Sequence, residues 1–421
     1  MALKADSQLG RAYAGIASSS YNQGRLADAE KNYKLAISLI DRMSEREKLR
    51  TLGGYALMVR DHPQAVRQFS SLVREYPYDT AGTANLAFAY CLARDMAKAV
   101  ELGRKAVTLY RGNINQRLNL IMFLVYNGET AAALAEAHNI QDQKKAYVLT
   151  ALAQVLDGHP EEAAKALDAL QRTGPRGVSM ALSGSADLAM YQGRFSDAAS
   201  MLQQPPEEDA KDPRSDLAVG KALLRAEALA AKGAAGEAAR AAQIALSLSD
   251  QDAALVIAAQ VLTRAQQDDA AQKLAARLAE RVTPEPRAWA KVVAAELLLA
   301  HGKAPEAIEE LNQAQRLTDT WIGHFDLGRA YIEAGSFPQG VSEIDLCLKR
   351  RGEAASAFLV DDLPTIRYLP AVYYYAGRAQ EGVGSPRAAE SYKTFLTIKE
   401  KSESDPLVAD ARRRLAALGA K

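Results

Sequence analysis

The side chains that most often bind metals or act as nucleophiles are sparse in this chain and unsuitably spaced. The five histidines are His62, His138, His159, His301 and His324. No two of them are three or four residues apart, the spacing that would place two imidazoles on one helix face as metal ligands. Cys91 and Cys347 are the two cysteines, too far apart for a C-x-x-C pair, and we expect inert core thiols. The sequence therefore predicts no metal site and no thiol chemistry.

Catalytic signatures are also absent from the sequence. It contains no G-x-S-x-G nucleophile turn, no phosphate-binding P-loop, no G-x-G-x-x-G and no kinase-type catalytic loop. Asp361 and Asp362 form a carboxylate pair, but without the glycine of a calcium loop we expect them to be solvated. We predict that the protein is not an enzyme and needs no cofactor.

Charge and hydropathy exclude two further classes of protein. The 421 residues carry 52 lysines and arginines against 51 aspartates and glutamates, a net charge of +1, which excludes a strongly basic nucleic-acid binder. No apolar stretch approaches the length of a membrane span, and the first residues lack the apolar core of a signal peptide. We expect no nucleic-acid partner, no direct membrane contact and a cytoplasmic location, or a periplasmic one if the chain is a fragment of a membrane-anchored protein.

The elements that position the polar side chains come from an internal repeat. A small residue recurs at intervals mostly near 34 residues, and a glycine or another turn residue usually stands five positions before it. The recurring residues are Ala29, Ala65, Ala99, Ala133, Ala163, Ala198, Ala238, Ala270, Ala307, Gly340 and Ala389. Twelve residues before each stands a second small or apolar residue. This pattern predicts two helices joined by a tight turn, because small residues at their crossing let the helices approach closely.

The repeat resembles that of the tetratricopeptide family. The best matches are residues 85–90 with Ala99 and Ala106, and residues 325–331 with Trp321 as the early aromatic residue. The resemblance implies an all-α fold, a right-handed superhelical solenoid of about eleven hairpins. Asp405 and Pro406 have the residue types of an N-cap and a first helical position, so we expect a C-terminal capping helix.

A narrower resemblance concerns residues 40–53, and residues 347–353 together with 373–382. These segments look like tetratricopeptide regions found C-terminal to bacterial serine/threonine kinase domains, although the chain has no kinase motif. The resemblance implies the regulatory or sensing region of a bacterial signalling protein. Residues 2–6 are similar to the end of the second helix of a preceding repeat, which favours the interpretation that the chain is a fragment.

Two irregular stretches interrupt the predicted array. We expect an N-terminal array of about six hairpins at 1–204, a polar, proline-rich loop at 205–216, about four hairpins at 217–349, and a loop, a final hairpin and the capping helix at 350–421. Each irregular stretch could form a hinge or a loop that covers a groove. We favour a plain surface insertion for both.

Candidate binding residues lie on the first helix of each hairpin, which lines the inner face of such a solenoid. Counted from the small crossing residue, they are Asn85, Phe88, Asn115, Asn119, Met122, Tyr126, Asp187 and Tyr191. The resemblance implies that Asn85 and Asn119 hydrogen-bond the backbone of a bound peptide, since an amide both donates and accepts. Phe88, Met122 and Tyr126 would receive apolar side chains, and ordinary packing is the alternative role. The family's clamp for acidic chaperone tails needs lysine and arginine at positions where this chain has Asn115 and Asn119. An acidic chaperone tail is therefore not the expected ligand.

A second candidate patch mixes aromatic residues with arginine, as interface anchors often do. It consists of Phe325, Asp326, Arg329, Tyr374, Tyr375 and Arg378. Packing against the irregular stretch at 350–366 is the alternative. The sequence therefore predicts a non-catalytic scaffold that binds another protein or a peptide. A self-association module and a sensor of a small ligand or oligopeptide remain open as alternatives.

Overall fold

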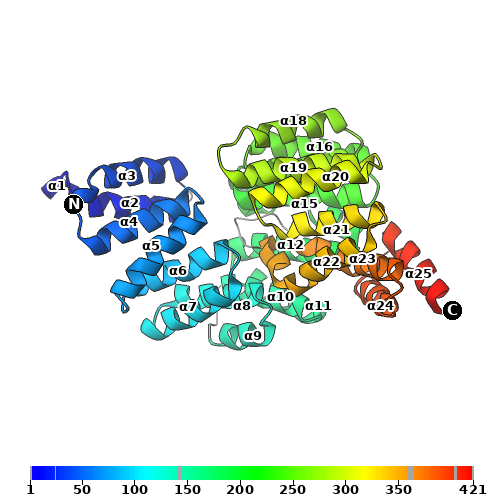
Figure 1. Ribbon diagram of the computed structural model, residues 1–421, viewed down its shortest axis with the longest axis horizontal. Helices are drawn as coiled ribbons and strands as arrows, with labels where there is room; N and C mark the ends of the chain where they lie inside the picture. The colour runs from blue at the N-terminus through cyan, green and yellow to red at the C-terminus, as the bar shows by residue number, and fades with distance from the viewer. Residues whose placement is uncertain (1, 24, 141–143, 359–364, 403–404, 420–421) are drawn as a thin grey trace. The chain divides into compact units, whose positions relative to one another are not determined.

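The computed structural model describes residues 2–23, 25–140, 144–358, 365–402 and 405–419. Within these ranges the chain forms helices and no β-strand, which confirms the all-α prediction (Figure 1). The chain divides into two compact units, Met1–Ile140 (unit 1) and Gln141–Lys421 (unit 2). None of the described helices combines the length and the apolar character that crossing a membrane requires.

The described part of unit 1 contains a short first helix followed by four helical hairpins. Its elements are α1 (Ala2–Ala5), α2 (Gly10–Asn22), α3 (Leu26–Ser38), η1 (Ile40–Arg42), α4 (Glu45–Met58), α5 (His62–Glu75), α6 (Thr80–Leu92), α7 (Met96–Leu109), α8 (Ile114–Tyr126) and α9 (Thr130–His138). Each even-numbered helix packs on the helix that follows it, and each hairpin packs on the next. The stack is the one that the repeat predicts.

The described part of unit 2 contains seven hairpins and a final single helix. Its elements are α10 (Lys144–Leu156), α11 (Pro160–Gln171), α12 (Pro175–Tyr191), α13 (Phe195–Met201), α14 (Glu207–Lys211), α15 (Asp216–Ala231), α16 (Ala235–Leu248), α17 (Asp252–Arg264), α18 (Asp268–Ala279), α19 (Pro284–Ala300), α20 (Ala304–Leu317), α21 (Trp321–Glu333), α22 (Phe337–Lys349), η2 (Arg351–Phe358), η3 (Ile366–Tyr368), α23 (Leu369–Gly382), α24 (Ala388–Ile398) and α25 (Pro406–Gly419). Helix α25 packs on α24, as expected of a capping helix.

The hairpin turns follow the predicted spacing. From the α4–α5 turn onward, each hairpin turn contains one residue with positive φ, a conformation that glycine adopts most easily. In three turns this residue is Arg60, Arg94 or Gln266. Because Gln266 sets the turn before α18, the buried crossing residue five positions later is Ala271 and not Ala270. The last hairpin also differs by one residue, since Ala388 is buried and Ala389 is only half-buried.

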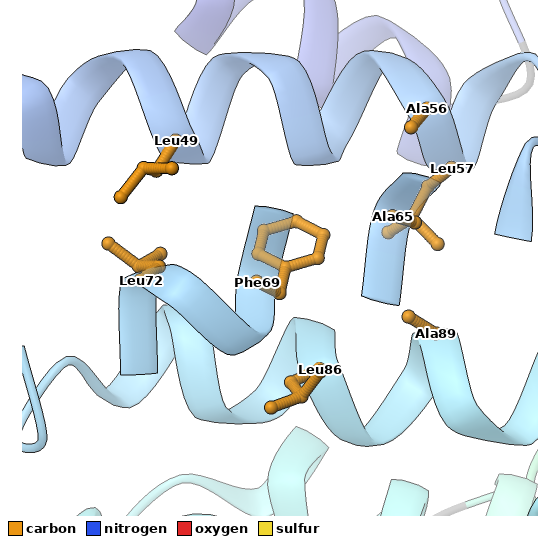
Figure 2. Close-up of a cluster of buried hydrophobic side chains, with 8 residues drawn as sticks. All are labelled: Leu49, Ala56, Leu57, Ala65, Phe69, Leu72, Leu86 and Ala89. Carbon is orange, nitrogen blue, oxygen red and sulfur yellow. The ribbon is translucent and has the colours of Figure 1, made fainter. Parts of the chain in front are cut away.

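Neighbouring hairpins share one apolar core, as Figure 2 shows for α4, α5 and α6. Phe69 of α5 is fully buried at its centre, beneath Leu49 and Leu57 of α4 and beside Leu86 of α6. Burial of such a ring contributes about 1.5–3 kcal/mol. A Cβ atom on Gly53 of α4 would lie 2.8 Å from the Phe69 ring. The crossing position must therefore be small, which explains the residue type that the repeat conserves along the chain.

The proline-rich stretch at 205–216 lies within unit 2 and includes the short helix α14. Asp209 of this helix is buried, and its Oδ2 atom lies 2.9 Å from Nζ of Lys221 in α15. The hydroxyl of Ser179 in α12 donates to Oδ1 of Asp209 at 2.6 Å. Most of the stretch is exposed, as expected of a surface insertion, and the buried ion pair of Asp209 with Lys221 anchors it between two first helices.

The stretch after α22, in contrast, is largely buried where the structure describes its side chains. Ala354 and Ala355 of η2 are fully buried, and Ile366 of η3 is nearly so. Segment η2 contacts α10, α12 and α21, and η3 contacts α12 and α23. All of these are first helices of hairpins, so the stretch packs on the inner face of unit 2 and is not a surface insertion. Asp361 and Asp362 lie outside the described residues.

Residues from the end of unit 2 also bond to its second hairpin. Nζ of Lys399, which follows α24, donates to the carbonyl oxygen of Met190 in α12 at 3.2 Å, and Ser402 donates to the carbonyl oxygen of Gly193 at 3.2 Å. Lys399 is buried and also lies 3.3 Å from Oδ2 of Asp405, the residue before α25. Unit 2 is therefore held together by contacts between hairpins far apart in sequence, in addition to those between neighbours.

Candidate functional site

In unit 1, two asparagines occupy the same register of consecutive first helices. Asn85 lies two residues before the crossing residue Ala87 of α6, and Asn119 lies two residues before Ile121 of α8. Asn85 is exposed and Asn119 is half-buried, and neither side-chain amide has a hydrogen-bond partner among the described residues. Helices α6 and α8 contact each other. The two amides are therefore available to a ligand that crosses these helices.

Apolar side chains stand one residue after the same crossing positions. Phe88 of α6 and Met122 of α8 are half-buried, and Phe88 packs against the core of Figure 2. We call Asn85, Phe88, Asn119 and Met122 the unit 1 row. It carries no charge. Amides that both donate and accept, beside partly exposed apolar surface, can hold an extended backbone and its apolar side chains.

Two further predicted residues of unit 1 flank this row differently. Asn115 is exposed in the first turn of α8, and Tyr126 is buried in the last turn of the same helix. Asn115 is thus open to a ligand, whereas the Tyr126 ring belongs to the packed interior.

A buried carboxylate fixes helix α6, which carries half of the unit 1 row. Oδ1 of Asp79 accepts the Gly82 amide at 2.7 Å and so caps α6. Arg50 of α4 lies 2.6 Å from Oδ1, and Arg46 of α4 lies 2.8 Å from Oδ2. Burial alone would raise the pKa of Asp79, but Arg50, the Gly82 amide and Arg46 outweigh it and hold the pKa below its ordinary value. The cap thereby ties α6 to α4 across a hairpin boundary.

In unit 2 the residue six positions before the positive-φ residue of the turn is polar in six consecutive hairpins, counting from α12. We call these residues the unit 2 row: Asp187, Glu227, Gln260, Glu296, Arg329 and Arg378. They correspond in register to Phe88 and Met122 of unit 1. The first three are buried and the last three are half-buried. A buried carboxylate needs a charged or hydrogen-bonding partner.

The partner of the first two carboxylates comes from η3. Nη2 of Arg367 lies 2.8 Å from Oδ1 of Asp187, and Nη1 of Arg367 pairs with Glu227. The hydroxyl of Tyr368 donates to the other oxygen of Glu227, and the guanidinium of Arg264 lies 5.9 Å from the centre of the Tyr368 ring. Burial raises the pKa of Asp187 to about 6 against the attraction of Arg367. One arginine and one tyrosine thus fill the space between two hairpins.

The remainder of the unit 2 row is linked by its own polar contacts. Nε2 of Gln260 donates to Oε1 of Glu296 at 2.9 Å. Burial, with help from the Asp326 charge, raises the pKa of Glu296 to about 8, although Arg264 and Arg329 oppose the shift. Arg329 donates to Oδ1 of Asp326 at 2.6 Å. The inner face of unit 2 is therefore a charged, largely paired surface.

The second predicted patch is a packed cluster in the structure. Phe325, Asp326 and Tyr374 are buried, and Arg329 lies 5.6 Å from the ring centres of both Phe325 and Tyr375. The Phe325 and Tyr375 rings meet edge to face at 5.7 Å.

Two outer members of the patch bond to neighbouring helices. The Tyr374 hydroxyl donates to Asp410 of α25 at 2.6 Å, and Arg378 donates to Glu333 of α21 at 3.1 Å. The structure thus brings the six residues together, with three of them inaccessible to a partner.

The last two predicted residues, Asp187 and Tyr191, are also buried. Burial raises the pKa of the Tyr191 hydroxyl above its ordinary value. Asp187 is paired with Arg367. Sequence analysis missed Glu227, Glu296 and Arg367, although reading the residue after each crossing position would have found the first two.

The structure adds two facts about metal and thiol chemistry. Within the ranges that the structure describes, no three His, Cys, Asp or Glu side chains gather in a way that could hold a metal ion. Cys91 and Cys347 are both buried thiols, and burial raises the thiol pKa of Cys347. Neither thiol is placed to act as a nucleophile.

Solved structures that are similar to this chain include the following three. The Cut9–Hcn1 hetero-tetramer of the APC/C is 13% identical in sequence, with a TM-score of 0.37, and the match covers 90% of this chain and 90% of that chain. A tetratricopeptide repeat protein from Parabacteroides merdae is 15% identical, with a TM-score of 0.43, and the match covers 68% of this chain and 98% of that chain. Yeast Tom70 is 11% identical, with a TM-score of 0.44, and the match covers 98% of this chain and 96% of that chain. We infer no function from likenesses at this level.

No family model matches the chain, and no curated protein does. The helical hairpins, their turns and their crossing residues are therefore the features that define the class of this protein, a repeat protein of stacked helical hairpins.

Proposed function

We propose that the protein is a non-catalytic scaffold and that the unit 1 row binds an extended segment of another protein. The observation that carries this proposal is the pair of side-chain amides at Asn85 and Asn119, in equal register and without partners among the described residues. Two amides on neighbouring hairpins can bond to successive backbone groups of one extended chain.

The chemistry of the row also limits the ligand. Phe88 and Met122 offer apolar surface, and the row has no charged member. A segment with small or apolar side chains fits this surface better than a strongly charged one, because a charge would lose water without gaining a partner. We further propose that the partner belongs to a bacterial signalling pathway, which the narrower resemblance of residues 40–53 and 347–353 supports.

The test compares partner capture by the natural chain and by a chain with Asn85→Ala and Asn119→Ala. Asn32→Ala with Asn139→Ala is the matched control, because both of those amides bond to the backbone of their own helical segments. We expect the first variant to bind the partner at least about tenfold more weakly, because it loses two hydrogen bonds of about 1 kcal/mol each. The control should bind normally.

Two other outcomes contradict this assignment. A partner retained by both variants would place the site away from the unit 1 row. Absence of any partner, with a mass that rises with protein concentration, would favour the self-association alternative.

A further inference from the structure

We infer that the unit 2 row is a recognition site for an arginine followed by a tyrosine, and that Arg367 and Tyr368 occupy it as a ligand belonging to the same chain. This inference concerns unit 2 and is independent of the peptide site proposed on unit 1. It rests on where the segment lies, how it is held and which side chains contact it.

The location is that of a ligand on a helical-repeat surface. Segment η3 contacts α12 and α23, both first helices. Its side chains reach Asp187 and Glu227, which occupy the register where unit 1 presents Phe88 and Met122. The segment therefore lies on the surface that the repeat leaves free in each first helix.

The way the segment is held also resembles a bound peptide. Its backbone bonds are local: the Tyr368 amide donates to the carbonyl oxygen of Thr365, and the Leu369 amide donates to the carbonyl oxygen of Ile366. The Thr365 hydroxyl donates to the carbonyl oxygen of Ala354. These bonds stay within the stretch between α22 and the first residue of α23. Its polar bonds to the unit 2 row are made by the side chains of Arg367 and Tyr368. Side-chain anchoring of a locally bonded segment is one of the ways in which a short peptide is recognised.

The contacts specify the ligand chemistry. Two carboxylates from successive hairpins bracket one guanidinium, and the planar fork of arginine offers a separate N–H group to each carboxylate, an arrangement that the compact ammonium group of lysine reproduces less well. Glu227 also accepts the Tyr368 hydroxyl, and Arg264 lies near the ring face. The site should therefore prefer Arg–Tyr over Lys–Tyr and over Arg–Phe.

The main test uses the full chain with Arg367→Ala and Tyr368→Ala, and a fluorescent peptide Thr-Ile-Arg-Tyr-Leu that copies residues 365–369. A tethered segment has an effective concentration in the millimolar range, so the natural chain should bind this peptide at least about tenfold more weakly than the variant. Replacing the peptide arginine by lysine, or its tyrosine by phenylalanine, should weaken binding to the variant by about tenfold.

The control for the peptide experiment is a variant that leaves Arg367 and Tyr368 in place. Arg176→Ala removes an exposed arginine of α12 and should bind the peptide no better than the natural chain does. A folded double variant that fails to bind the peptide overturns the inference. Equal binding to the natural chain and the double variant also overturns it, because the peptide would then use another site.

A second measurement needs no substitution and decides the matter if the double variant does not fold. Hydrogen exchange of the natural chain should show residues 365–368 exchanging at least about tenfold faster than the centres of α12 and α15, because a bound segment can leave while its site stays folded. Exchange of all three at one common rate would show that the segment is an inseparable part of the core. Partner binding by unit 1 should be the same for the natural chain, the double variant and Arg176→Ala, because the unit 1 row is unchanged in all three.

Discussion

Lys399 donates a hydrogen bond from Nζ to the carbonyl oxygen of Met190, 209 residues earlier in the chain, at 3.2 Å. In a simple repeat array, each hairpin contacts only its neighbours, and stability is nearly a sum of local terms. The Lys399 contact breaks that rule in unit 2. The second and last hairpins of this unit must therefore lose structure together.

Lys399→Met should make the unfolding of unit 2 less cooperative and lower its stability by about 2–4 kcal/mol, because the Asp405 side chain, which is only 8% exposed, is left without its cation. Lys401→Met is the control, since Lys401 is exposed and lies 3.7 Å from an exposed Glu161. It should cost less than about 0.5 kcal/mol. Urea unfolding measured by circular dichroism distinguishes the two, and equal losses would show that the Lys399 contact is unimportant.

Asp79→Asn should destabilise unit 1 by about 2–4 kcal/mol, because Arg46 and Arg50 both lose their carboxylate. Since the folded pKa of Asp79 is lowered, its contribution is present above the unfolded pKa of about 4 and is lost as the pH falls through the folded value. Asp61→Asn is the control. Asp61 caps α5 by accepting one backbone hydrogen bond, from the Gln64 amide, and its substitution should cost at most about 1 kcal/mol. Denaturation from pH 7 down to pH 2 tests this, and parallel curves for natural chain and Asp79→Asn would contradict it.

Glu296→Gln should stabilise unit 2 in alkaline solution and not in acid. The folded pKa of Glu296 is raised to about 8, so its favourable contribution is complete below the unfolded value near 4.5 and is lost as the pH rises through about 8. Glutamine keeps an oxygen for the Gln260 amide and never ionises. We expect a gain of about 1–3 kcal/mol at pH 8.5 and little change at pH 4.5, measured by urea unfolding. A gain of equal size at both values would assign the effect to packing.

Gly377→Ala should destabilise the last hairpin by about 1–3 kcal/mol, because the new methyl group would lie 2.6 Å from the fully buried ring of Tyr392. Gly220→Ala makes the same change in an exposed position of α15 where nothing lies within 4 Å. It should raise stability by about 0.5–1 kcal/mol through helix propensity. Opposite shifts in melting temperature support the crossing-residue explanation, and shifts of one sign refute it.

Much of the fold was predictable because it depends on local spacing. Positive φ at Arg60 and Arg94 was implied by their distance from Ala65 and Ala99, even though neither is glycine. The one-residue errors at Ala270 and Ala389 arose where alanine stands at adjacent positions, so residue type alone could not choose between them. Such errors leave the hairpin in place and shift its register.

The site was less predictable because it depends on contacts between distant residues. Asn85 and Asn119 could be placed by counting within their own hairpins, and the structure leaves both amides accessible. Arg367 could not be connected to Asp187, 180 residues earlier, because no local pattern indicates that the stretch after α22 returns to the inner face of α12. Phe325 and Tyr374 have the residue types of an interface, and only their burial shows that they face the interior.

The long separation of Arg367 from its two carboxylates also sets an order of events during synthesis. At about 5–20 residues per second, a ribosome adds Arg367 roughly 9–36 s after Asp187. Until then Asp187, and Glu227 once it has been added, have no Arg367 to neutralise them, and Met190 has no Lys399. Unit 1 has every one of its hairpins available long before then. The nascent chain can therefore complete unit 1 early, whereas unit 2 gains its long-range contacts only after Arg367 and Lys399 have emerged.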